Sequence, residues 1–221
     1  MFDLRKLIFG GGAVLSEDVS ALLADWQALP AVALDEPHFH TRYVLLDALG
    51  EGEGGGPRSL AALGMPQGGS LAAADALFID LLGGGADAGV VDPAQLDRQL
   101  AAFLRFAGKS PLVTFHAPSV LGKLQKVLKA RLGVDYAPPC IDLVWLLPSV
   151  FDDLADKPQS LDRWLEIFGF EPEGRRDAMG NVLELGRLFQ RLLARAGSTG
   201  LDTASRLVDE SHASTFLRRT H

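Results

Sequence analysis

The segment Tyr43-Val44-Leu45-Leu46-Asp47 constrains the fold more than any other part of this sequence. Its apolar run is unbroken and ends on a carboxylate, and the glycine-rich stretch 50–56 follows. An apolar run of this length between turn residues is typical of a strand that is buried on both faces. We therefore predict a central strand over 43–47, with Asp47 at the edge of a sheet, where α/β folds bind their ligands.

The composition is that of an ordinary globular chain. The 221 residues are 48% hydrophobic and 22% charged, which is enough for one domain with a full core and an additional arm. Cys140 is the single cysteine, so no disulfide can form within the chain, which fits a reducing cytoplasm. No stretch reaches the roughly 18 apolar residues of a membrane span, and the N-terminus lacks the pattern of a signal peptide. We expect a cytoplasmic protein with no membrane partner.

The charge balance narrows the classes of ligand. The chain carries 21 basic and 28 acidic residues, a net charge of −7. An acidic protein repels a polyanion at long range, so a broad DNA-coating surface is not expected. A narrow, metal-assisted nucleic-acid site remains compatible, because bound cations reverse the local sign of the charge.

Residues 1–41 are predicted to form an N-terminal helical arm. Ser16 is a candidate helix cap, and an apolar stripe follows at helical spacing and ends before Pro30: Val19, Leu22, Leu23 and Trp26. The stripe needs a partner, either the main domain or a second subunit in a homo-oligomer. The linker that follows carries His38 and His40. A metal site there is less favoured than a solvated loop, since no further His or Cys lies nearby in the sequence.

The remaining chain alternates strands and helices. Strands are predicted at 58–63, 76–81, 111–116 and 141–147, the last as a strand or a strand running into a helix. The alanine-rich segment 71–75 could instead be helical. Helices are predicted from Asp92, over 117–132 with a stop at Gly133, over 160–169 and over 176–196. Residues 197–221 are predicted to be a loosely packed C-terminal tail, with a short helix near 203–208.

This order of elements predicts a fold class. The first three strands can form an antiparallel meander, and the next is joined through a helix, which favours a parallel crossover. We predict an α/β protein with a mixed five-stranded sheet flanked by helices, as in the ribonuclease H-like fold. The lysines at 123, 126 and 129, with Arg131, form a basic helix face that is most simply solvated, with a weak phosphate contact as the alternative.

Four segments carry a family resemblance: 46–52, 112–121, 141–143 and 176–182. On these segments the chain, from Arg42 to about Ala194, resembles the DnaQ-like (DEDDh) 3′–5′ exonucleases, the group of the DNA polymerase III epsilon subunit. The resemblance implies an exonuclease-like domain over 42–196. It also implies a site with four carboxylates that hold two Mg²⁺ or Mn²⁺ ions about 4 Å apart, and a histidine as general base.

Only one of the five family residues is present when each position is carried over. The first acid is Asp47. The other four positions hold Leu49, Leu121, Arg176 and Asn181. Magnesium requires oxygen ligands, which leucine lacks, and a guanidinium does not accept a proton at neutral pH. The resemblance therefore predicts a vestigial catalytic residue in Asp47, no metal ligands and no bound cofactor. We expect His116, Arg176 and Asn181 to contact a substrate.

Three alternatives keep some chemistry in the chain. Asp177 could take the place of the last acid, because it lies one helical turn from Asn181. Glu51 or Glu53 could replace the missing glutamate. Cys140 and His116 could form a nucleophile pair, although a cysteine after two prolines is more often a buried filler.

Three functional hypotheses follow. The first is a catalytically degenerate exonuclease fold, a pseudoenzyme that binds a nucleic-acid 3′ end or a partner protein. The second is an active metal-dependent 3′–5′ exonuclease with a shifted set of ligands. The third is a subunit that assembles through its N-terminal helix.

Overall fold

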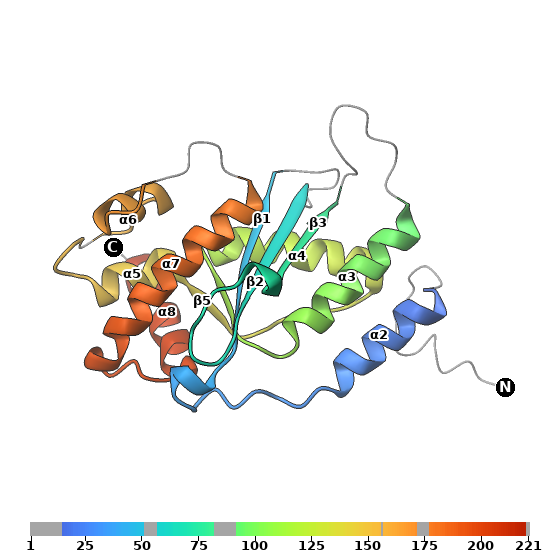
Figure 1. Ribbon diagram of the computed structural model, residues 1–221, viewed down its shortest axis with the longest axis horizontal. Helices are drawn as coiled ribbons and strands as arrows, with labels where there is room; N and C mark the ends of the chain where they lie inside the picture. The colour runs from blue at the N-terminus through green and yellow to red at the C-terminus, as the bar shows by residue number, and fades with distance from the viewer. Residues whose placement is uncertain (1–14, 51–56, 82–91, 156, 172–176, 220–221) are drawn as a thin grey trace.

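A sheet of five strands forms the middle of the protein in this computed structural model, which describes residues 15–50, 57–81, 92–155, 157–171 and 177–219. The strands are β1 (Tyr43–Leu49), β2 (Ser59–Met65), β3 (Ala76–Asp80), β4 (Leu112–Thr114) and β5 (Cys140–Asp142). The helices are α2 (Glu17–Ala28), α3 (Pro93–Ala107), α4 (Ala117–Leu132), α5 (Leu143–Val150), α6 (Leu161–Ile167), α7 (Ala178–Ala196) and α8 (Ala204–Arg219) (Figure 1). Short 3₁₀ turns lie at His38–His40, Ala73–Asp75 and Gly197–Thr199.

The strand order is β3-β2-β1-β4-β5, with β1 in the centre. β1 pairs antiparallel with β2 over its whole length, from Tyr43↔Met65 to Leu49↔Ser59, and β2 pairs antiparallel with β3. β1, β4 and β5 run parallel, with Leu45 opposite Val113. The antiparallel meander followed by parallel crossovers confirms the predicted mixed sheet, and this order of strands is that of a ribonuclease H-like fold.

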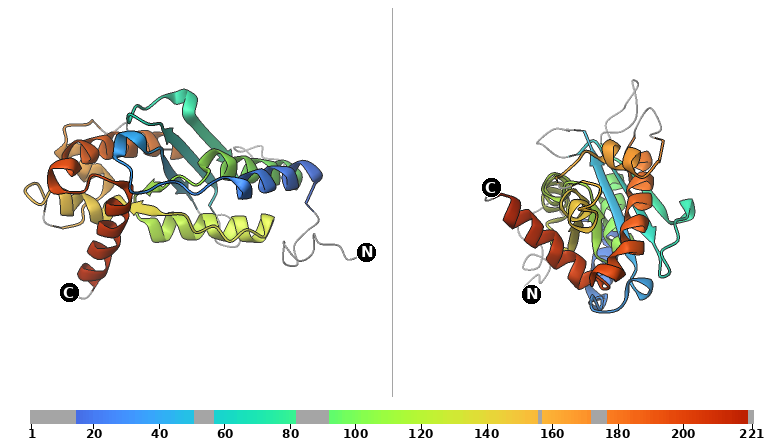
Figure 2. Two further views of the ribbon diagram at one scale, coloured as in Figure 1. Left: turned by 90° about the horizontal axis from the view of Figure 1, so that it is seen from below. Right: turned by 90° about the vertical axis from the view of Figure 1, so that its left-hand side faces the viewer.

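Alternation along β1 divides the core into two layers. Val44, Leu46 and Ala48 belong to a buried cluster with α2, α3 and α4. Tyr43 and Leu45 belong to a second cluster with α5, α6, α7 and α8. Helices thus cover both faces of the sheet, with α7 on one side and α4 on the other (Figure 2). Because successive side chains of a strand point to opposite faces, Asp47 lies on the α7 side.

The apolar stripe of α2 has its partner within the chain. Val19 and Leu23 are fully buried, and Trp26 is nearly so, in the cluster that includes α3 and α4. The Nε1 of Trp26 donates to the carbonyl of Gly108 at the end of α3, at 3.0 Å. Ser16 is the N-cap residue of α2 but makes no capping bond with its side chain. The stripe packs against α3, whereas homo-oligomerisation of the chain stays a prediction.

The prediction of a loosely packed C-terminal tail is wrong for the described residues. α8 is longer than the short helix expected there, and it packs on α5 and β5. Ala204 and Leu207 are fully buried, and Ser211 is buried and accepts a hydrogen bond from the Asp142 backbone N–H at 2.9 Å. The apolar residues of α8 are too few to form a clear stripe in the sequence. Among the described side chains, its packing depends on the buried residues Ala204, Leu207 and Ser211.

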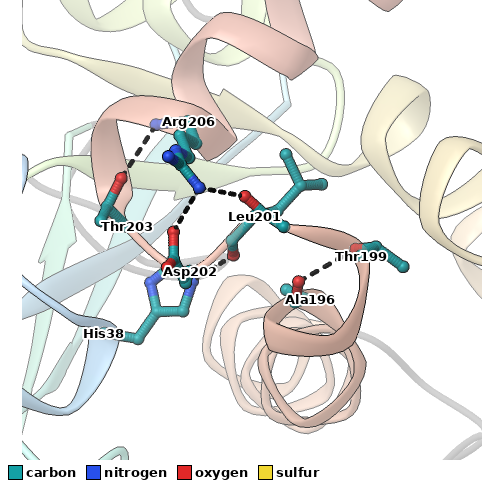
Figure 3. A network of polar contacts seen from close by, with 8 residues as sticks. His38, Ala196, Thr199, Leu201, Asp202, Thr203 and Arg206 are labelled. Atoms are coloured by element: carbon teal, nitrogen blue, oxygen red, sulfur yellow. Dashed lines mark hydrogen bonds and ion pairs between the residues drawn. The ribbon is translucent and has the colours of Figure 1, made fainter.

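The linker before β1 makes hydrogen bonds to the segment at the start of α8 (Figure 3). His38 lies half-buried between Tyr43, whose hydroxyl is 2.7 Å from Nδ1, and the carbonyl of Leu201, 2.6 Å from Nε2. Burial lowers the pKa of His38. The Ser205 backbone N–H donates to the carbonyl of Leu34 at 2.9 Å. The prediction of a solvated loop is therefore wrong for His38, while His40 is exposed beside Glu36.

None of the described helices combines the length and the apolar character needed to cross a membrane.

Because Leu207 is fully buried, Leu207→Ala should lower the free energy of unfolding by about 3 kcal/mol through lost burial and a residual cavity. The measurement is urea denaturation of the full chain. Leu154→Ala is the matched control, since Leu154 is 47% exposed and its truncation should cost less than about 0.5 kcal/mol. Equal losses in the two variants would show that α8 is not part of the core.

Candidate functional site

The candidate site is built around Asp47 near the C-terminal end of β1. Asp47 is half-buried and lies opposite Ala61 of β2. Its neighbours on the same face, Leu45 and Leu49, contact the apolar cluster beneath α7. A carboxylate in such surroundings needs a hydrogen-bond donor, because burying an unpaired charge is costly.

Asn181 supplies that donor. Its Nδ2 donates to Oδ2 of Asp47 at 2.8 Å. The orientation of the amide follows from chemistry, since an ionised carboxylate can only accept. The Oδ1 of Asn181 is buried without a hydrogen-bond partner among the described residues. The structure thus brings together two of the residues that the sequence analysis singled out, across 134 positions of the chain.

The first turn of α7 positions Asn181. Asp177 is the N-cap residue, and its Oδ1 accepts from the Gly180 backbone N–H at 2.7 Å. The Asn181 backbone N–H in turn donates to the Asp177 carbonyl at 3.1 Å. Asp177 is exposed. Its carboxylate is therefore used to start the helix, and Asn181 is the member of this pair that contacts Asp47.

Of the other carried-over positions, Leu49 lies on the same face of β1 as Asp47, but Leu121 does not share that side of the sheet. Leu49 contacts the apolar cluster on the α7 side of the sheet, whereas Leu121 contacts the cluster on the opposite side. Arg176, Glu51 and Glu53 lie outside the described residues. Within the described ranges, no group of three or more His, Cys, Asp or Glu side chains is arranged to hold a metal ion.

His116 lies at the same edge of the sheet as Asp47. It follows β4, the strand next to β1, and it is exposed. Its backbone is in the left-handed region, with φ 72° and ψ 65°, the only non-glycine residue with positive φ in the described chain. A non-glycine residue held in this region stores strain, and such residues are concentrated at functional sites.

Asp142 holds this strained turn in place, a role that the sequence analysis missed. The carboxylate accepts from the backbone N–H groups of His116 and Ala117, both at 2.9 Å, and from that of Val144 at 3.1 Å. It therefore joins the first turns of α4 and α5, where backbone N–H groups have no partner within the helix. The available signal was its place directly before a helix, which is typical of an N-cap.

Cys140 and His116 do not form a nucleophile pair. Cys140 is buried in the cluster with α3 and α4, whereas His116 is exposed. Burial and the nearby Asp142 raise the pKa of the Cys140 thiol to about 12. The thiolate, which is the nucleophilic form, is therefore suppressed at neutral pH.

No protein-family model and no curated protein matches the sequence. Among solved structures, the chain is similar to a 3′-exonuclease described in the 3′-end specific recognition of histone mRNA stem-loop. The two chains are 13% identical, and the match covers 74% of this chain and 84% of the other, with a TM-score of 0.48. The assignment of the fold rests on the order and directions of the strands.

Asn181→Asp should destabilise the protein by about 2 kcal/mol at pH 7, because it replaces a hydrogen bond to Asp47 by repulsion between two carboxylates. Such a pair shares a proton, which raises one folded-state pKa above its unfolded value. The penalty is present above that pKa and shrinks as the pH falls below it. Urea denaturation at pH 7 and pH 4.5 measures the difference.

The control for this prediction is the exchanged pair Asp47→Asn/Asn181→Asp. It restores one amide and one carboxylate and should recover more than half of the lost stability at pH 7. A penalty for Asn181→Asp that does not depend on pH, or a double variant that recovers nothing, would show that the two side chains do not interact in solution.

His116→Gly should raise the free energy of unfolding by about 0.5–1 kcal/mol, because glycine adopts positive φ without the steric cost that other residues meet. His116→Ala keeps a Cβ and should show no gain. Denaturant midpoints of the two variants are the measurement. If the His116→Gly variant were no more stable than the His116→Ala variant, the backbone at this position would not be strained.

Proposed function

We propose that this chain is a catalytically inactive protein of the exonuclease-like fold, related to the DNA polymerase III epsilon group, and that it works by binding a single-stranded nucleic-acid end. The observation that carries the proposal is the hydrogen bond between Asp47 and Asn181. A neutral amide contacts the carboxylate at the position where the family resemblance places another metal-binding acid.

The donor set explains the expected loss of hydrolysis. Two-metal hydrolysis requires several oxygen ligands around a pair of cations. Leu49 and Leu121 provide none. The resemblance places Arg176 at the position of the general base, and a guanidinium keeps its proton at any physiological pH. Asp47 alone cannot hold two divalent ions.

The remaining side chains suit binding. Asn181 and the exposed His116 lie at one edge of the sheet, and Arg176 directly precedes the capped start of α7 in the sequence. Amide, imidazole and guanidinium groups all donate hydrogen bonds to phosphate and sugar oxygens. A small set of such donors suits a short segment of nucleic acid better than a long duplex, which agrees with the net charge of −7.

An active exonuclease with a shifted set of ligands is the alternative. It would need Asp47 together with acids from 51–56 or Asp177. The hydrogen bond that Asp177 accepts from the Gly180 backbone N–H favours the inactive protein. Asp177 would have to lose this helix-capping bond in order to bind a metal ion. A partner protein in place of nucleic acid stays a further prediction.

The test is incubation of the purified chain with labelled single-stranded DNA in millimolar Mg²⁺ or Mn²⁺. We expect the DNA to stay intact and the melting temperature to be unchanged by either metal, since ligand binding to the folded state would raise it. The combined variant Leu49→Glu/Arg176→His/Asn181→Asp should gain metal-dependent cleavage if these positions are carried over correctly. Leu121 is left unchanged because it contacts the cluster on the opposite side of the sheet.

The same three substitutions together with Asp47→Ala form the control, and this variant should cleave nothing. Cleavage by the unmodified chain that is abolished by Asp47→Ala would overturn the proposal and establish the active alternative.

A further inference from the structure

The outer surface of α7 is the feature that the proposed function leaves unexplained. Its charged residues are Arg187, Arg191, Arg195 and Glu184. Glu184 is buried, with 6% of its surface exposed. Arg187 and Arg191 are exposed and Arg195 is partly so. The helix therefore presents only positive charge to solvent, in a chain whose net charge is −7.

The three arginines form one line, which we call the arginine stripe. They are four residues apart, so they share one face of the helix. Each step is about 6 Å along the axis, and the stripe begins about 9 Å from Asn181 and ends about 21 Å from it, at 1.5 Å per residue. α7 runs along the sheet with its first turn near the end of β1 (Figure 1). The stripe therefore leads away from the Asp47–Asn181 pair.

Two of the guanidinium groups lie over aromatic rings. Arg191 is 5.6 Å from the centre of the Phe170 ring, and Arg195 is 4.9 Å from that of Phe151. A guanidinium over a ring is held by cation–π attraction and still has N–H groups at its edge for other acceptors. The stripe is thus partly preorganised, which reduces the entropy lost when a ligand binds.

Ion pairing leaves most of the charge of the stripe available. Arg195 pairs with Asp153 at 2.8 Å. No carboxylate of the described residues is recorded as an ion-pair partner of Arg187 or Arg191. On α4, by contrast, Lys129 pairs with Asp135 and Arg131 pairs with Asp97. Two charges of the basic face that the sequence analysis noticed are therefore paired, whereas in the stripe Arg195 alone has an ion-pair partner among the described residues.

We propose that the arginine stripe binds the phosphates of a single-stranded nucleic acid whose end lies at the Asp47–Asn181 pair. This inference rests on the proposed function, and it adds the path of the strand. A strand has one phosphate per about 3.4 Å in stacked form, so each arginine step spans about two nucleotides. Regular spacing on a rigid helix suits a regular polyanion better than the irregular charges of a protein surface.

The test is a fluorescence-anisotropy titration of labelled oligothymidylate with the full chain, in EDTA and at several salt concentrations. Arg187→Gln/Arg191→Gln should weaken binding at least about fivefold at 50 mM salt, because two phosphate contacts are lost. It should also reduce the slope of log K against log salt by about 1.4, at 0.7 per phosphate contact for single strands.

The matched control is Arg98→Gln/Arg105→Gln on α3, which packs on the other side of the sheet. It removes the same charge from exposed arginines that pair with Asp18 and Asp25. We expect less than about a twofold change in affinity and an unchanged salt slope, since the nucleic acid does not contact these two arginines. Equal losses of affinity in the two double variants would show a general effect of charge and would overturn the proposal.

Two further outcomes decide the proposal. No binding by the unmodified chain at 50 mM salt would overturn it, and so would equal affinity for polyglutamate of the same number of charges. Hydrolysis in the presence of metal would overturn the proposed function alone, because the titration in EDTA measures binding without cleavage.

Discussion

The hydrogen bond between Asp47 and Asn181 joins the two elements on which the rest of the structure depends. β1 is the central strand, and α7 contacts both β1 and β2. On the α7 side of β1 the neighbouring side chains are apolar, so a carboxylate there is stable only with a donor. Asn181 provides one from the first turn of α7, where Asp177 fixes the start of the helix. The pair therefore fixes the position of the first turn of α7 relative to the C-terminal end of β1.

Local patterns were sufficient to predict most of the sheet. Short-range sterics and burial determine several elements: the strand at the apolar run 43–47, the turns at the glycines and the helix that begins at the proline of α3. The structure has a strand, a turn or a helix at each of these places. Asp47 and Asn181, two of the positions carried over from the family resemblance, are in direct contact. Those positions are separated by most of the domain, so periodicity alone could not have paired them.

The features that were missed depend on contacts between distant segments. Asp142 accepts N–H groups from two helices and donates its own N–H to Ser211. α8 is held by Ala204, Leu207 and Ser211 rather than by a continuous apolar face. His38 is bonded to Tyr43 on one side and to Leu201 on the other. A single buried position in a polar segment carries too weak a signal for a pattern argument, because its partners are known only after folding.

If the proposed function holds, the replacements at the positions carried over from the family resemblance also change the electrostatics in favour of binding. A site with four carboxylates repels phosphate unless bound cations offset the charge. In this chain the corresponding positions keep one carboxylate, Asp47, which already accepts a hydrogen bond from Asn181. A phosphate can therefore approach this edge of the sheet without a metal. At physiological salt, charges more than about 8 Å away are largely screened, so the exposed arginines of α7 would act on phosphates that lie along the helix rather than on one beside Asp47. On the proposed function, a loss of metal ligands and a binding role would thus follow from the same replacements.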